Sequence, residues 1–193
     1  MDITSATTPP SASTVHRPRR ARLTTALASA IAVAAVGLAT GCSPAASHAD
    51  TVVPNATVLK VIDGDTVDVR SDQRGRLRIR ILGINTPETK FKLECGGPEA
   101  STYGHKLLDD QRVAIVTDPT QDSTDRFGRT LAYVFLASGD NYSVLATRSG
   151  HARAYVYGHR PSQWADRISS AERQAQADGI GIWGEPCRTK PGE

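Results

Sequence analysis

The sequence predicts an α+β domain, mainly β, in which a small five-stranded barrel carries three helices. Three short runs rich in valine, isoleucine and leucine come first, as in a meander of strands. A helical segment follows, then two more strand-like runs, and two further helical segments complete the chain. Strands in this order, with helices inserted between and after them, favour an α+β domain built on a small barrel.

The strands are identified from β-branched residues and from alternation of apolar and polar positions. The third run alternates most clearly, in Leu77-Arg78-Ile79-Arg80-Ile81, which predicts one buried side and one side that carries arginines. A polar loop, 118–128, separates the last two strands. The five expected strands are 56–61, 66–70, 77–84, 113–117 and 131–136.

The helices are identified from their ends and from apolar residues at helical spacing. Pro98 stands at a favourable position in the first turn of one helix, and Gly150 stops the second. Gly179 is a suitable C-terminal cap for the third. The three expected helices are 98–110, 141–149 and 162–178, the last with Trp164, Ile168, Ala171 and Ala175 facing inward.

The first 49 residues have the order of an export signal. A basic segment, 16–22, precedes an uncharged stretch, 23–41, with an apolar centre rich in alanine and valine. A membrane-spanning helix is the alternative, but the stretch is short for one and poor in leucine and isoleucine. We therefore expect a signal and linker over 1–49, followed by one domain over 50–193.

The end of this segment resembles the lipobox of bacterial lipoproteins, in Leu38-Ala39-Thr40-Gly41-Cys42. The resemblance implies cleavage before Cys42 and lipidation of that cysteine. Ordinary cleavage after Ala49 is the alternative, because small residues occupy the spacing that signal peptidase prefers. The protein is thus expected outside the cytoplasm, either lipid-anchored to the outer face of the cell membrane through Cys42 or secreted.

The positive charge of the chain belongs to its first segment. The whole chain has a net charge of +3, and residues 1–49 hold four arginines and one aspartate. The remaining 144 residues therefore have a net charge of zero. Global charge gives no support for nucleic-acid binding, so any such function must depend on local clusters.

The cysteines predict a disulfide. With Cys42 lipidated, Cys95 and Cys187 remain as a pair in an oxidising compartment. A metal site is a weaker alternative, because two thiols without a nearby CxxC or HxxxH pattern cannot complete a tetrahedral set. The five histidines show no metal-ligand spacing either.

Asp63-Gly64-Asp65 interrupts a strand pattern. Asp-Gly between apolar runs is a strong signal for a hairpin turn, so Asp63 is interpreted as the residue that forms the turn. The turn leaves Asp65 without a role. The segment is not an EF-hand loop, because Val67 occupies a ligand position and the required glycine is missing.

Four polar segments, taken together, indicate a role for Asp65. They are Asp63-Gly64-Asp65-Thr66, Gly83-Ile84-Asn85-Thr86-Pro87-Glu88 after Arg80, Asp125-Arg126-Phe127-Gly128-Arg129, and Ala154-Tyr155-Val156-Tyr157. In this order they resemble the thermonuclease family, the staphylococcal-nuclease-like domains, over about residues 56–184. The resemblance implies an OB-fold barrel, a bound Ca²⁺, and hydrolysis of phosphodiester bonds in DNA and RNA, with single strands preferred and 3′-phosphate products.

The resemblance also implies roles for individual residues. Asp65 becomes a metal-binding carboxylate, and the carbonyl of Thr86 becomes a second ligand. Arg80 and Arg129 become the pair that binds the phosphate, and Glu88 becomes the general base. These roles suit the residue types, since Ca²⁺ prefers oxygen ligands, arginine matches phosphate oxygens, and a carboxylate can deprotonate water.

Two positions depart from the family pattern. Asn85 stands where well-known members have an aspartate, so its amide oxygen is expected to bind calcium more weakly. Phe127 stands where a tyrosine hydroxyl would meet a terminal phosphate, and Arg126 beside it is a candidate to compensate. Tyr155 and Tyr157 are the remaining candidates for substrate binding, although their alternation on an expected strand places one of them in the core.

Other functions remain open at this point. Asn85 favours a binding module that holds nucleic acid without cutting it, although Arg80, Glu88 and Arg129 are all retained. A lipid-anchored structural protein would explain none of the convergent polar residues. We expect a monomer, and the sequence implies no protein partner.

Overall fold

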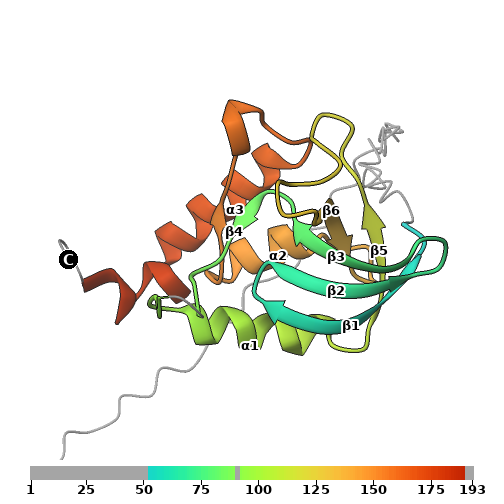
Figure 1. The fold of residues 1–193 in the computed structure, drawn as a ribbon. Coiled ribbons are helices and arrows are strands. Elements are labelled where there is room, and N and C mark those ends of the chain that lie inside the picture. Colours follow the sequence, from blue (N-terminus) through green and yellow to red (C-terminus); the bar gives the residue numbers. More distant parts are fainter. Residues whose placement is uncertain (1–51, 90–91, 190–193) are drawn as a thin grey trace, which may run out of the picture. The chain divides into compact units, whose positions relative to one another are not determined.

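The computed structural model describes residues 52–89 and 92–189 (Figure 1). Contacts divide the chain into Met1–Pro44 and Ala45–Glu193, and every described residue belongs to the second unit. The expected signal, its cleavage sites and the lipidation of Cys42 lie outside the described residues and stay predictions. In the described ranges, no helix combines the length and the apolar character needed to cross a membrane.

Seven strands and three α-helices make up the described part of the chain. The strands are β1 (Ala56–Asp63), β2 (Thr66–Ser71), β3 (Gly75–Ile81), β4 (Ile84–Asn85), β5 (Arg112–Val116), β6 (Thr130–Phe135) and β7 (Arg153–Ala154). The helices are α1 (Gly97–Leu108), α2 (Tyr142–Arg148) and α3 (Ala165–Asp178), with 3₁₀ turns at Tyr157–His159, Gly181–Trp183 and Cys187–Thr189.

Five of the strands close into a barrel in the order β1-β2-β3-β6-β5 (Figure 1). β3 and β6 pair in parallel, whereas the other neighbours are antiparallel. β4 and β7 form a separate two-stranded sheet. The α+β fold, a five-stranded OB-fold barrel with three helices, is therefore confirmed.

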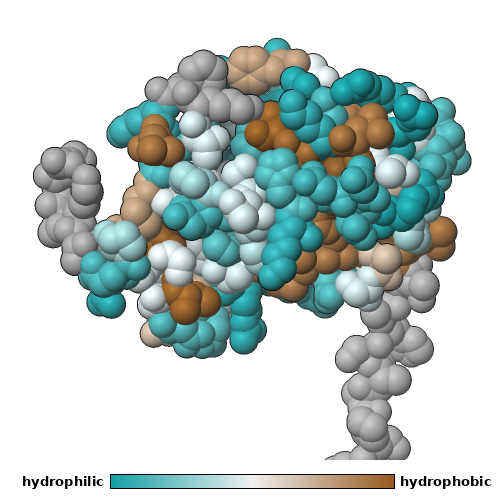
Figure 2. Space-filling view, turned by 90° about the horizontal axis from the view of Figure 1, so that it is seen from below, coloured by the Kyte–Doolittle hydropathy of each residue, from teal (hydrophilic) through white to brown (hydrophobic). Residues whose placement is uncertain are grey.

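The core fills the barrel and the space beneath the helices. Ile79 and Ile81 are buried, and the arginines that alternate with them lie on the outer side of β3, as the alternation predicted. α1 packs against β1, and α2 lies between β6 and α3. On the face shown in Figure 2, hydrophobic side chains appear as separate spots among hydrophilic ones.

Three predicted details are wrong. The expected strand 77–84 ends at Ile81, because Gly83 has a φ of 80° and turns the chain back into β4. β7 ends at Ala154, so Tyr155 and Tyr157 do not lie on a strand, and both are exposed rather than core. The third helix begins at Ala165 instead of residue 162, and the N–H of Gln163 just before it donates to the carboxylate of Asp118.

This contact of Asp118 anchors the long loop between β5 and β6. Asp118 Oδ2 accepts from the N–H of Gln163 (2.7 Å) and from the hydroxyl of Tyr133 (3.1 Å). Its Oδ1 accepts from the N–H and the hydroxyl of Thr120 (2.8 and 2.7 Å). Burial alone would raise the pKa of Asp118, but these hydrogen bonds hold it below its usual value. Burial also raises the pKa of Tyr133 to about 12, so the hydroxyl remains a donor.

A disulfide joins Cys95, just before α1, to Cys187 after α3. The two cysteines are 92 positions apart, so the bond closes most of the domain into one loop. Cross-linking such distant residues lowers the entropy of the unfolded chain. The expected pairing is confirmed.

The double variant Cys95→Ser/Cys187→Ser should lower the free energy of unfolding by about 3 to 5 kcal/mol, because the unfolded chain regains its freedom. Urea unfolding of residues 50–193 measures the change, and the unaltered protein in reducing agent should match the variant. A change below about 1 kcal/mol would show that the disulfide contributes little.

Asp118→Asn should destabilise the fold by about 2 kcal/mol at neutral pH, because four donors lose a charged acceptor. The pKa of Asp118 is lowered in the folded state, so its contribution is complete above its unfolded pKa. The contribution disappears as pH falls through the folded pKa. Unfolding curves at several pH values should thus converge for the two proteins in acid, and a constant difference would contradict this assignment.

Candidate active site

The Asp-Gly turn between β1 and β2 positions Asp65 at the rim of the barrel. Asp63 Oδ1 accepts from the N–H of Asp65 (3.2 Å), as expected for a turn-forming aspartate. Gly64 packs so closely on Thr86 that an added Cβ would lie 2.7 Å from a side-chain carbon. The buried Tyr142 hydroxyl, whose pKa burial raises, donates to the Gly64 carbonyl (2.9 Å). The turn is therefore held from both sides.

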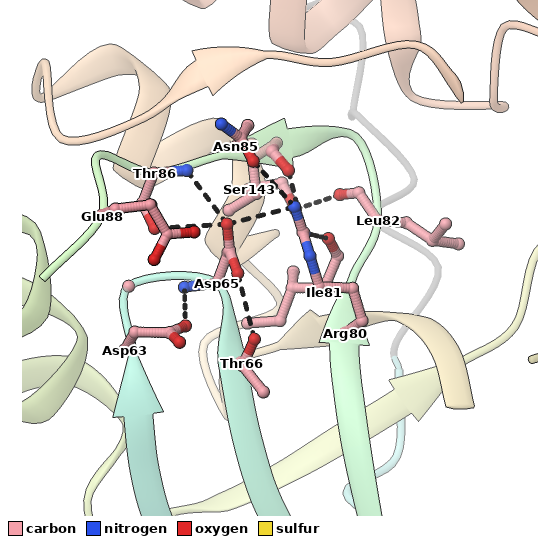
Figure 3. A network of polar contacts seen from close by, with 12 residues as sticks. Asp63, Asp65, Thr66, Arg80, Ile81, Leu82, Asn85, Thr86, Glu88 and Ser143 are labelled. Carbon is pink, nitrogen blue, oxygen red and sulfur yellow. Dashed lines mark hydrogen bonds and ion pairs between the residues drawn. The ribbon is translucent and has the colours of Figure 1, made fainter. Parts of the chain in front are cut away.

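The carboxylate of Asp65 is the centre of a polar network (Figure 3). Its Oδ2 accepts from the N–H and the hydroxyl of Thr86 (3.0 and 3.2 Å), and its Oδ1 accepts from the hydroxyl of Thr66 (3.1 Å). Oδ2 also lies 3.1 Å from Arg80 Nη2. Because the carboxylate is buried, these partners offset the cost of removing its charge from water.

Arg80 joins the end of β3 to β4. Its Nη1 donates to the carbonyls of Ile81 (2.8 Å) and Ile84 (2.9 Å), and its Nη2 donates to Asn85 Oδ1 (3.1 Å). The turn at Gly83 brings these acceptors around the guanidinium. With Asp65 as the fourth partner, Arg80 has one well-defined position at the rim.

The same contacts bring together the side-chain oxygens of two predicted metal ligands. Asp65 Oδ2 and Asn85 Oδ1 each lie 3.1 Å from Arg80 Nη2, so two oxygens converge on one positively charged group. Figure 3 shows Glu88 beside Thr86, next to this network. Carboxylate and amide oxygens are donors that Ca²⁺ prefers.

The donor set fits a hard cation, but it carries little negative charge. Within the ranges that the structure describes, no three His, Cys, Asp or Glu side chains form a group suited to a metal. Asn85 contributes an oxygen without a charge. That Thr86 supplies its carbonyl stays a prediction.

Arg129 lies directly before β6, near the same rim. β6 pairs in parallel with β3, with Arg80 opposite Leu131, so closure of the barrel brings Arg129 towards Arg80. Asp125 Oδ2 accepts from Arg129 Nε (2.7 Å), and its Oδ1 accepts from the N–H groups of Arg129 (3.0 Å) and Phe127 (2.9 Å). Burial would raise the pKa of Asp125, but these hydrogen bonds lower it.

The structural pairing of Arg129 with Asp125 does not exclude a role in binding. Among the described residues, only Nε of the guanidinium has a hydrogen-bond partner. The two Nη groups have no hydrogen-bond partner among these residues. Asp125 is thus a positioning residue for Arg129.

A pocket of about 740 Å³ lies between the two arginines and the segment after β7. β4 pairs with β7, and the N–H of Tyr155 donates to the Gly83 carbonyl (2.9 Å), which brings the tyrosines to the pocket. Seven of the predicted site residues line it. They are Arg80, Asn85, Arg126, Phe127, Arg129, Tyr155 and Tyr157, whereas Asp65, Thr86 and Glu88 are not part of the lining.

The pocket combines aromatic rings with guanidinium groups. Phe127 is exposed, and the guanidinium carbons of Arg126 and Arg129 lie 4.7 and 5.4 Å from its ring centroid. Tyr155 and Tyr157 expose their rings as well. This mixture suits a ligand that has both negative charge and flat rings.

Sequence reasoning missed the residues that close one side of the pocket. Arg160 Nη2 donates to Asp122 Oδ2 (2.9 Å), and Gln121 Nε2 donates to the carbonyl of Arg160 (3.1 Å). All three residues line the pocket. No local pattern could have paired them, because they come from two polar loops that only the fold brings together.

Comparison with known proteins agrees with the fold and the site. Residues 78–185 match the family model described as "Staphylococcal nuclease homologue". The thermonucleases of Staphylococcus hyicus and Staphylococcus intermedius are 37% and 35% identical over 130 and 129 residues, which cover 65% of this chain and 73% and 74% of theirs. Endonuclease YncB of Bacillus subtilis is 32% identical over 133 residues, 67% of this chain and 61% of that protein.

The family match spans more than half of the chain, and the similarity to the thermonucleases extends over most of their length. The barrel, the arginines at its rim and the pocket agree with it. The chain therefore belongs to the family of staphylococcal nuclease homologues.

Proposed function

We propose that this protein is a calcium-dependent nuclease that cuts DNA and RNA, prefers single strands and leaves 3′-phosphate ends. Its family makes it a nuclease, a hydrolase of phosphodiester bonds in nucleic acids. One observation carries the finer proposal. Arg80 of β3 and Arg129, just before the paired strand β6, line one pocket beside Asn85, and the oxygens of Asp65 and Asn85 both lie against Arg80.

The two arginines are proposed to bind the phosphate that is cut. A guanidinium offers paired N–H groups that match two phosphate oxygens. Charge grows on these oxygens as water attacks phosphorus, so fixed donors stabilise the transition state more than the ground state. The contacts of Arg80 with β4 and of Arg129 with Asp125 keep both groups in place before the substrate binds.

Glu88 is proposed to orient and deprotonate the attacking water. Its N–H donates to Glu94 Oε2 (3.1 Å), and its carbonyl accepts from the N–H of Glu94 (2.9 Å), so Glu94 holds both main-chain polar groups of Glu88. The residue is exposed, so its carboxylate has access to water. A carboxylate one water away from phosphorus can act as a general base.

Asp65, Asn85 and the carbonyl of Thr86 are proposed to hold calcium. Bound calcium supplies charge neutralisation and orientation at a non-bridging phosphate oxygen. In this structure Arg80 Nη2 holds the oxygens of Asp65 and Asn85 itself. If Asp65 and Asn85 turned their oxygens from Arg80 to calcium, the Nη2 group of Arg80 would be free to donate to the phosphate.

The substrate preference is inferred from the pocket. The exposed rings of Phe127, Tyr155 and Tyr157 suit bases that are not already stacked in a duplex. Stacking tolerates every base, so we infer little sequence preference. Phe127 has no hydroxyl for a terminal phosphate, and Arg126 over its ring can supply a charged donor instead.

A second candidate function is a binding module without catalysis, which the neutral Asn85 favours. Release of acid-soluble nucleotides from heat-denatured DNA, with calcium, with magnesium and with EGTA, separates the two. Calcium-dependent release supports the nuclease. Binding without release at millimolar calcium supports the module.

Export of the protein is also a proposal, either as a lipoprotein that begins at Cys42 and is anchored through it, or as a secreted protein that begins at Asp50. The bond between Cys95 and Cys187 supports an oxidising compartment. We also propose a monomer.

Arg129→Gln should lower kcat for denatured DNA by roughly a hundredfold to a thousandfold, because an aligned charged donor to the transition state is lost. Arg173→Gln on α3, an equal change of charge on an exposed residue outside the pocket, is the control. Equal kcat values for the two variants, with both proteins folded, would remove Arg129 from the catalytic groups.

Asn85→Asp should lower the calcium concentration for half-maximal activity by roughly tenfold, because a charged oxygen replaces a neutral one beside Asp65. Calorimetric titration with calcium measures the binding directly. If the calcium affinity and the calcium dependence of activity both stay unchanged, Asn85 is not a calcium ligand.

A further inference from the structure

A row of arginines on the outer face of the β2–β3 hairpin leads away from the active site. Arg70 is directly paired with Arg76 across the hairpin, and the next pairs are Asp68 with Arg78 and Thr66 with Arg80. Directly paired residues lie on the same face of a sheet, as do alternate residues of one strand. Arg70, Arg76 and Arg78, here called the arginine row, therefore share the face that carries Arg80.

The row has more positive charge than Asp68, the carboxylate that it binds, can neutralise. Asp68 Oδ1 and Oδ2 accept from Arg78 (2.7 and 3.0 Å), and Oδ2 lies 3.4 Å from Arg76. The side chain of Asp68 is 7% exposed, whereas those of Arg78 and Arg76 are 53% and 69% exposed. The exposed Arg70 has no hydrogen bond or ion pair from its side chain to any described residue.

Asp63 also acts electrostatically on Arg78, but the other neighbouring charges do not reduce the excess. The exposed Lys60 of β1 is paired in register with Asp68 and adds a further positive charge. Asp72, at the hairpin turn, is bound by Arg112 through both of its oxygens (2.7 and 2.8 Å). The hydrogen bond from Arg78 keeps the pKa of Asp68 low against its burial, so the pair stays ionic. One arginine is enough to satisfy Asp68, which leaves the others for another role.

The geometry of the row matches an extended nucleic-acid strand. Alternate residues of a strand are about 6.7 Å apart, similar to the repeat of phosphates along an extended single strand. The row continues the line of Arg80 along β3, from the rim towards the hairpin turn. In OB-folds generally, the face of strands 2 and 3 is one that can bind oligonucleotides.

We propose that the arginine row is an extended substrate subsite, which binds phosphates of the nucleic-acid strand that flank the bond to be cut. The inference rests on the proposed function, because it takes Arg80 as the residue that meets the cut phosphate. A long strand would contact the row, whereas a dinucleotide would reach only the pocket.

The double variant Arg70→Gln/Arg76→Gln tests the subsite and keeps the Asp68–Arg78 pair intact. In full-length protein with EGTA, its Kd for a labelled single strand of roughly thirty nucleotides should rise by about tenfold. The slope of log Kd against log salt should fall by about 1.4, since each lost phosphate contact in a single strand removes about 0.7. With calcium, KM should rise for the long strand only, and kcat and the kinetics on a dinucleotide should stay unchanged.

Arg173→Gln is the matched control, and it should leave Kd and the salt slope unchanged. The single variant Arg70→Gln provides a second test if the double variant does not fold, and about half of the change in slope is expected. Unchanged binding of the long strand, or an equal loss for Arg173→Gln, would overturn the proposal. It would also be overturned if the variant binds DNA normally but loses binding to vesicles of anionic phosphatidylglycerol.

The two proposals can fail separately. Full-length protein that binds the long strand but cuts nothing would contradict the proposed nuclease. The subsite would still stand if the double variant weakened that binding. Normal cleavage of both substrates by the double variant, with unchanged KM, would contradict the subsite alone.

Discussion

The ion pair between Asp65 and Arg80 is the interaction on which the rest of the site depends. It joins the β1–β2 turn to the end of β3, and the same guanidinium binds the carbonyl of Ile84 and the side chain of Asn85. Both side chains are largely buried, so either one alone would be an uncompensated charge. The pair therefore fixes the turn and the start of the Asn-Thr-Pro-Glu segment at once.

Closure of the barrel adds the second half of the site. The parallel pairing of β3 with β6 is the only parallel contact among the described barrel strands, and it places the segment before β6 beside the end of β3. Asp125 then holds Arg129, and Asp118 attaches the same loop to the chain before α3. Two arginines that are far apart in sequence thus share one pocket because the barrel is closed.

The distribution of charge explains how a domain without net charge can bind a negatively charged substrate. Residues 50–193 have no net charge, but acidic side chains pair with arginines in positions that leave other arginines exposed. Within the guanidinium of Arg129, Asp125 binds only Nε, and Asp68 is satisfied by Arg78 with Arg70 and Arg76 still exposed. Local arrangement, and not total charge, produces a surface suited to phosphates.

The sequence by itself determined the strands and helices of the barrel, the Asp-Gly turn, the cysteine pair and the residue types of the site. These follow from periodicity, turn chemistry and short motifs, which are local properties of the chain. Only the tertiary structure decided that the third strand breaks at Gly83, that Tyr155 and Tyr157 are both exposed, and that Arg160 and Asp122 close the pocket. It also decided that Arg80 holds the oxygens of Asp65 and Asn85. These features depend on contacts between segments that barrel closure brings together, and no local pattern records such contacts.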